Sequence, residues 1–146
     1  MRALFMMKMP TAAFAGLRVD RVSDEETVVS VPGGWRTQNP FGTMYWAVQG
    51  MAAELSTGIV PICISRSMDM KLRMFVVGTA ATFGKKAFGR CHFTCQDTFR
   101  VPEAIEASLS SGESTNCELR SIGTDSAGET VSEWVFTWNF LATEGK

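Results

Sequence analysis

The chain has 146 residues, enough for one domain that buries a sizeable hydrophobic core. Hydrophobic residues make up 45% of it and charged residues 20%, a composition typical of globular proteins. The formal net charge is -1 and the isoelectric point is about 5.8, so the chain has no electrostatic footprint for nucleic acid. We therefore expect a single domain over residues 1–146 that does not bind nucleic acid.

The N-terminal segment is the only part of the chain that suggests a targeting signal. Apolar residues follow Arg2, but Lys8 and Pro10 interrupt them before they reach the length of a signal peptide. A short helix lying on the domain is the favoured interpretation. No apolar run approaches the ~20 residues of a membrane span, so we expect no membrane insertion.

The four cysteines do not form a metal-binding pattern. Cys91 and Cys95 would share one face of a strand, about 13 Å apart and too far to bind one ion. His92 would point to the opposite face. We expect no metal site, and four reduced thiols are typical of a cytoplasmic protein.

The predicted elements begin with two strands and a helix. Residues 17–23 and 26–32 are short β-type runs separated by polar residues, as in a hairpin. Residues 43–57 carry apolar side chains at helical spacing. Gly58 and Pro61 are expected to end this helix.

The second half of the chain is dominated by β patterns. From Ser65 onward, strands are expected over residues 67–77, 88–97, 114–125 and 129–142. Residues 101–112 fit either a short helix or an extended edge. The last strand places four aromatic side chains on one face: Trp134, Phe136, Trp138 and Phe140. One dominant helix among mostly antiparallel strands indicates the α+β class, with a curved sheet wrapped around the helix.

Residues 39–58 contain a single charged side chain, Glu54. If the helix is buried, this carboxylate must be paired, hydrogen-bonded or functional, because desolvating it alone is costly. Gly50 and Gly58 lie four residues before and after it, so a ligand, a sheet backbone or a partner chain could approach this stripe closely. A glutamate simply exposed to solvent is the alternative that the pattern leaves open.

The predicted helix start has features of a site that polarises a carbonyl group. Asn39 opens a tight loop through Gly42 and Thr43 into the helix, whose free N–H groups and dipole favour negative charge. A carboxylate about three turns further along would suit hydrolysis of an activated acyl group. Because the two features are far apart within one chain, an antiparallel helix from a second subunit is required, and we expect a homodimer. An asparagine in such a place is more often a turn former than a catalytic residue, and Tyr45 and Trp46 more often serve core or interface packing than ligand contact.

The segment that begins at Asn39 resembles the signature of hotdog-fold acyl-CoA thioesterases of the phenylacetate-pathway and 4-hydroxybenzoyl-CoA types. In that signature an Asn or Gln and a Gly precede His-Gly-Gly at the helix start, and an acidic residue follows. The matching positions are Asn39, Gly42-Thr43, Ala47 and, fifteen residues after the asparagine, Glu54. The predicted order of elements also matches the hotdog fold, so the resemblance covers most of the chain. Two segments are closer still to a hotdog branch classed only as a domain of unknown function: Trp35-Arg36 and residues 128–140.

The resemblance implies a thioesterase that splits acyl-CoA into an acid and CoA, works as a homodimer or dimer of dimers, and needs no cofactor. Glu54 would be the general base or nucleophile, and Asn39 would orient substrate or water. CoA phosphates could meet Lys85, Lys86 or Arg90, with solvated turn charges as the alternative role. The implied substrate-binding positions are Gly42, Thr43, Tyr45, Trp46, Ala47, Gly58, Lys85 and Lys86.

Two departures from the family pattern keep other functions open. Tyr45 stands where the family has a histidine, and Trp46 stands where it has a glycine. These bulky side chains favour a non-catalytic protein that binds acyl-CoA or another apolar ligand. A hotdog dehydratase would pair a histidine with an acidic residue. That activity is disfavoured because His92, the only histidine, is predicted on a strand far from the helix start.

Overall fold

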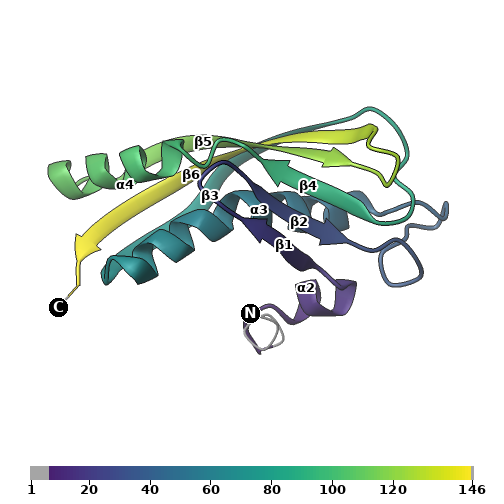
Figure 1. Ribbon diagram of the computed structural model, residues 1–146, viewed down its shortest axis with the longest axis horizontal. Helices are drawn as coiled ribbons and strands as arrows, with labels where there is room; N and C mark the ends of the chain where they lie inside the picture. The colour runs from purple at the N-terminus through teal and green to yellow at the C-terminus, as the bar shows by residue number, and fades with distance from the viewer. Residues whose placement is uncertain (1–6, 146) are drawn as a thin grey trace.

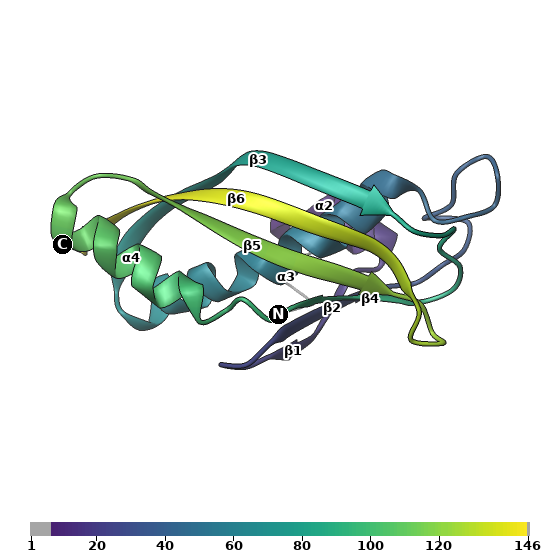
Figure 2. The same ribbon diagram turned by 90° about the horizontal axis from the view of Figure 1, so that it is seen from above.

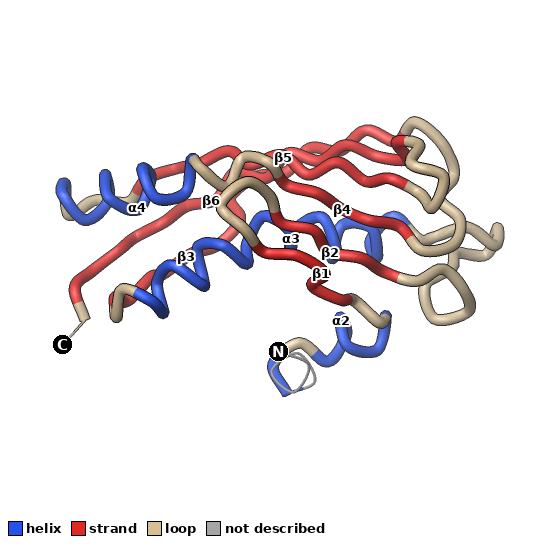
Figure 3. The backbone as a smooth tube through the Cα atoms, in the orientation of Figure 1, coloured by secondary structure: helices blue, strands red, loops and turns tan. Residues whose placement is uncertain are grey.

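A computed structural model describes residues 7–145 of the chain. Its six strands form one antiparallel sheet that arches over a long helix, and two shorter helices lie at the borders (Figure 1). Figure 3 shows the same arrangement by secondary structure, with the long helix beneath the sheet. The predicted α+β architecture, a curved antiparallel sheet around one helix, is confirmed.

All six predicted strands are present. The strands are β1 (Arg18–Val22), β2 (Thr27–Val31), β3 (Met70–Phe83), β4 (Cys91–Cys95), β5 (Thr115–Thr124) and β6 (Thr130–Glu144). The helices are α2 (Pro10–Ala15), α3 (Trp46–Ser67) and α4 (Arg100–Ser111). The expected short N-terminal helix corresponds to α2, and of the two alternatives for residues 101–112 the helix is correct.

The sheet has the strand order β1-β2-β4-β5-β6-β3. Seen from above, β1 and β3 lie at opposite edges (Figure 2). The first two strands form the predicted antiparallel hairpin, with a bulge between Val19 and Arg21. The long strand β3 pairs with β6 along almost its whole length, from Met70 opposite Glu144 to Phe83 opposite Ser132.

The predicted end of the central helix at Thr57 is wrong, because α3 continues through Gly58 and Pro61 to Ser67. Proline within a helix removes one hydrogen bond, but burial of the surrounding residues offsets this cost. The glycine has a packing role: a Cβ added at Gly58 would lie 3.0 Å from Cζ2 of Trp138. Tertiary contacts therefore override the local stop signal.

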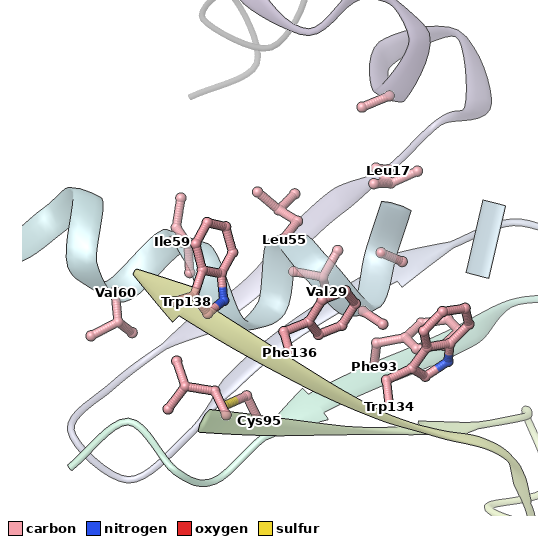
Figure 4. Packing of buried hydrophobic residues seen from close by; sticks show 14 of the residues in the cluster. Leu17, Val29, Leu55, Ile59, Val60, Phe93, Cys95, Trp134, Phe136 and Trp138 are labelled. Carbon is pink, nitrogen blue, oxygen red and sulfur yellow. The ribbon is translucent and has the colours of Figure 1, made fainter. Parts of the chain in front are cut away.

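Strand β6 packs two indole rings into the glycine positions of α3. A Cβ added at Gly50 would lie 3.2 Å from Cη2 of Trp134, and Trp138 fills the equivalent place beside Gly58. The indole N–H of Trp138 also donates a hydrogen bond to Oγ1 of Thr57 at 2.8 Å. Figure 4 shows both indoles on the side of β6 that faces α3. The glycine stripe does mark a close approach, and the groups that approach are side chains of the sheet.

Helix α3 is long and apolar enough to cross a membrane by composition alone, with a mean hydropathy of 1.4 over its best window. However, 56% of that window is buried inside the protein. At its centre, the hydroxyls of Ser56 and Ser121 share a buried hydrogen bond of 2.7 Å that ties the helix to β5. These contacts make α3 the core helix of the fold.

We expect Gly58→Val to lower the free energy of unfolding by about 1–3 kcal/mol, the usual cost of overpacking a core. The indole of Trp138 cannot move aside easily, because Thr57 holds its N–H and it stacks on Phe140. Denaturant titration followed by circular dichroism measures the change. Cys63→Val is the matched control, since Cys63 is an exposed position of the same helix. Equal effects of the two substitutions would show that the indole contact contributes nothing.

Candidate functional site

The loop before α3 is organised by the side chain of Asn39. Its Oδ1 accepts hydrogen bonds from the backbone N–H of Phe41 at 3.0 Å and of Thr43 at 3.2 Å. Its Nδ2 donates to Oγ1 of Thr43 at 2.9 Å. Gly42, between them, has a positive φ of 74°, which glycine adopts without strain. Asn39 therefore fixes the loop that delivers the chain to the helix, and one of its amide hydrogens remains for another partner.

The start of α3 presents unpaired backbone donors. The N–H of Tyr45 is occupied, because it donates to the carbonyl of Thr37 at 2.8 Å. Among the described residues, the N–H groups of Trp46 and Ala47 have no hydrogen-bond partner, as is usual in the first turn of a helix. The donors left free at the helix start are thus those of Trp46 and Ala47, and the N–H of Tyr45 is not among them.

Glu54 is half-buried on α3 and has no partner among the residues that the structure describes. Within residues 7–145, its carboxylate makes no hydrogen bond and no ion pair. Burial raises the pKa of Glu54 above its ordinary value of 4.5, because the charged form loses hydration. A half-buried carboxylate with no compensating contact is expensive for the fold, and a raised pKa of this kind is characteristic of functional acids and bases.

Glu54 and the free donors do not meet within one chain. Ala47 precedes Glu54 by seven residues, which places the two on one face of the helix but about 10 Å apart along its axis. A single carbonyl group cannot contact both. The separation expected from the sequence is therefore present, and one protomer does not bring the carboxylate and the free donors together.

The other predicted substrate-binding positions divide into two groups. Tyr45 and Trp46 are 45% and 57% exposed, and their rings meet edge to face with centroids 5.9 Å apart. Thr43 is buried and serves the loop of Asn39. Gly58 is buried against an indole, so its prediction as a substrate contact is not supported by its position.

The basic turn between β3 and β4 is partly neutralised. Lys85 donates to Asp125 at 2.9 Å and also pairs with Glu129. Its hydrogen bonds to Glu129 and then Asp125 raise the pKa of Lys85 to about 12. Lys86, the next residue, makes no ion pair with any described residue. Lys85 is therefore engaged within the protein, and Lys86 is the member of the pair left to meet a ligand.

The two cysteines that flank His92 do not supply a nucleophile. Cys91 and Cys95 are buried, and burial raises the pKa of each thiol to about 11, so both are protonated at neutral pH. His92 lies between them and points to the other face of the sheet, as alternation predicted. In the part of the chain that the structure describes, no three His, Cys, Asp or Glu side chains are grouped as a metal site would require.

Gln49, one turn into α3, was not predicted from the sequence. Its side chain is only 4% exposed, and its Oε1 has no hydrogen-bond partner among the described residues. A buried acceptor without a partner costs about 1–3 kcal/mol. The signal available in the sequence was one amide side chain among apolar neighbours, which is easily taken for a solvent-exposed residue.

We expect Glu54→Gln to raise the free energy of unfolding at neutral pH. The folded-state pKa of Glu54 lies above 4.5, so its protonated form contributes stability that is complete below pH 4.5. That contribution is lost as the pH rises through the folded-state pKa, and the glutamine variant does not lose it. Denaturant titrations across this range should show a difference that grows with pH. Glu106→Gln, at an exposed position of α4, is the matched control; a difference for Glu54→Gln that does not grow with pH would contradict the effect of burial.

Comparison with known proteins places the chain in a family. The model of the family DUF4442, a domain of unknown function, matches residues 1–140. No curated protein matches the sequence. A solved protein of unknown function from Chlorobaculum tepidum is 12% identical, with a TM-score of 0.83 over 96% of this chain and 91% of that one. A Pseudomonas aeruginosa protein described as a probable thioesterase is 19% identical, with a TM-score of 0.79 over 97% and 93%.

A thioesterase from Staphylococcus aureus is a third structural relative. It is 11% identical, has a TM-score of 0.68 and covers 91% of this chain and 99% of its own. It was solved with alanine in place of a glutamine, and a second structure of the same protein has alanine in place of a glutamate fifteen positions later. At these identities the likeness shows the fold. The chain therefore belongs to the DUF4442 family and has the hotdog fold.

Proposed function

We propose that this hotdog domain is a cytoplasmic acyl-CoA thioesterase, which hydrolyses a thioester to a carboxylic acid and CoA. The observation that carries the proposal is the state of Glu54: half-buried, without a partner among the described residues and with a raised pKa. Nothing in the packing of α3 compensates this charge. A protein can retain such a group when the group has a chemical task.

The proposed reaction uses two protein groups. Ionised Glu54 removes a proton from water that attacks the thioester carbon, or attacks that carbon itself; a raised pKa makes it the stronger base. The carbonyl oxygen becomes an oxyanion, which the N–H groups of Trp46 and Ala47 would bind at the positive end of the helix dipole. When Glu54 acts as the base, the carbon–sulfur bond then breaks and CoA leaves as a thiol with the proton that Glu54 returns. When Glu54 acts as the nucleophile, breaking this bond leaves the acyl group on Glu54 as an anhydride, CoA leaves as a thiolate that takes a proton from solvent, and water hydrolyses the anhydride to release the acid.

The relatives support this assignment of residues. The glutamine and glutamate replaced in the Staphylococcus aureus thioesterase are separated by the same fifteen positions as Asn39 and Glu54 here. Asparagine and glutamine both carry a carboxamide, so the two chains would place the same pair of functional groups at the same spacing. In this proposal Asn39 orients the substrate or water with its remaining amide hydrogen.

The proposed site requires a second copy of the chain. Strand β3 is an edge strand of 14 residues that pairs only with β6 among the described strands. Its exposed side chains include Phe75 and Val77, which are 60% and 47% exposed. A long apolar edge of this kind is a template for pairing with another strand. We propose that two copies join at β3 in a homodimer, alone or within a dimer of dimers, and that each brings its helix start near the partner copy's carboxylate.

A non-catalytic binding protein is the second candidate. The exposed rings of Tyr45 and Trp46 favour it, since they stand at the helix start where an acyl-pantetheine arm would enter. Such a protein would bind acyl-CoA without releasing CoA. Measuring ligand binding and turnover on the same preparation separates the two functions.

We expect Glu54→Gln to lower turnover by about 100-fold or more, the scale of losing a positioned base or nucleophile. Release of free thiol from a panel of short, long and aromatic acyl-CoAs measures it. Glu106→Gln provides the matched control, because Glu106 is exposed on α4. Full activity of Glu54→Gln on a confirmed substrate would remove the mechanism and leave a binding site.

The proposed dimer predicts a species of twice the 16.0 kDa chain mass at micromolar concentration. The reason is that the free edge of β3 and its apolar side chains are stabilised only by pairing. Sedimentation velocity over a concentration series measures the mass. A single species of one chain mass throughout would rule out the composite site.

A further inference from the structure

The outer face of the sheet, on the side away from α3, holds a hollow of about 370 Å³ lined by basic side chains. Arg18 and Arg21 come from β1, His92 comes from β4, and Arg90 comes from the residue that precedes β4. Ser30 of β2 lies between them. The only acidic residue in the lining is Asp20.

The strand register explains why these residues converge. Arg18 is opposite Ser30 on the neighbouring strand, and Ser30 is opposite His92 on the next. Residues paired in this way share a face, so Arg18 and His92 flank the small serine at a separation of about 10 Å, two strand spacings. The space above Ser30 is the hollow.

Arg90 closes one side of the hollow without a charged partner. Its Nη1 donates to Oγ of Ser30 at 3.1 Å, and it makes no ion pair with any residue from 7 to 145. Ser30 is only 1% exposed under it. A neutral hydroxyl does not neutralise a guanidinium, so the fork of Arg90 retains donors and a full positive charge.

The acidic groups nearby leave the hollow positive. Glu26 holds Arg21 at 2.6 Å, so this pair adds little net charge. Asp20 lies 3.6 Å from Nε of Arg18 and 3.9 Å from Nε2 of His92, which is too long for a hydrogen bond in either case. The negative charge of Asp20 thus opposes the two positive charges of Arg18 and Arg90, and Asp20 forms no hydrogen bond with either arginine.

Protection of an edge strand is the alternative explanation for these charges, since arginines on an edge prevent sheets from joining. It accounts for Arg18 and Arg21, which are on the edge strand β1. It does not account for Arg90, which precedes the inner strand β4 and hydrogen-bonds to Ser30 of the neighbouring strand β2. The convergence on Ser30 requires a different cause.

We propose that this hollow binds a phosphate group, with Arg18, Arg90 and His92 as its donors. Guanidinium forks match phosphate oxygens in geometry and charge, and they bind phosphate more strongly than a hydroxyl. The site lies on the opposite face of the sheet from α3 and does not depend on the chemistry of Glu54. The phosphate belongs either to the nucleotide end of a CoA substrate or to a separate phosphorylated ligand.

Isothermal titration calorimetry with inorganic phosphate, at fixed pH and ionic strength, tests the site on the full chain. We expect saturable binding that Arg90→Gln weakens about tenfold or more, the effect of losing a charge-assisted hydrogen bond. Arg120→Gln is the matched control, because Arg120 pairs with Glu133 at 3.2 Å and does not line the hollow. Arg18→Gln replaces the first variant if melting curves show that Arg90→Gln does not fold.

Titrations with CoA and with 3′-dephospho-CoA separate the two sources of the phosphate. If CoA binds more tightly and Arg90→Gln removes the difference, the site holds the nucleotide end of the proposed substrate. If the two bind alike while inorganic phosphate still depends on Arg90, the ligand is a separate phosphorylated molecule. Absence of saturable phosphate binding, or equal losses in Arg90→Gln and Arg120→Gln, would overturn the proposal. Neither result bears on the thioesterase, whose test is turnover.

Discussion

The packing of two indole rings from β6 against α3 determines the geometry of the rest of the molecule. Trp134 and Trp138 occupy the places where Gly50 and Gly58 lack side chains, and the indole of Trp138 is held by a hydroxyl of the helix. This contact brings the helix close to the strand and fixes its rotation. Glu54 lies between the two glycines on the same stripe of the helix, four residues from each.

Burial also explains the electrostatic state of Glu54. The packing of α3 removes hydration from this carboxylate, and the helix provides no opposite charge nearby to replace the lost hydration. The fold therefore keeps a carboxylate in a place where its ionised form is disfavoured. A stable scaffold can tolerate one such group, and sites of chemistry are often built at this cost in stability.

Sequence patterns predicted the strands well because each has a strong local signal. The alternation of residues 129–142 and the turn residues between strands depend on neighbours in the chain. The end of α3 depends on distant residues instead. Gly58 and Pro61 are stop signals locally, and only the position of Trp138 shows why the helix continues.

The candidate site shows the same division between local and distant information. Glu54 could be identified from the sequence because a single charge in residues 39–58 is conspicuous by itself. The hydrogen bond that occupies the N–H of Tyr45 could not be predicted from the sequence, because its acceptor is the carbonyl of Thr37 across a loop. The basic hollow could not be predicted from the sequence either, because Arg18, Ser30 and Arg90 meet only through the pairing of three strands.

The two edges of the sheet differ in a way that limits how copies of the chain can assemble. One edge is β1, five residues long and bearing the charges of Arg18, Asp20 and Arg21; the other is β3, fourteen residues long and largely apolar. If copies of the chain pair only through the β3 edge, a dimer has no second edge of this kind at which a third copy could extend the sheet. In the proposed homodimer, association through β3 would therefore close after two copies by two-fold symmetry, and the charges of β1 would disfavour growth of the sheet into a fibril at that edge.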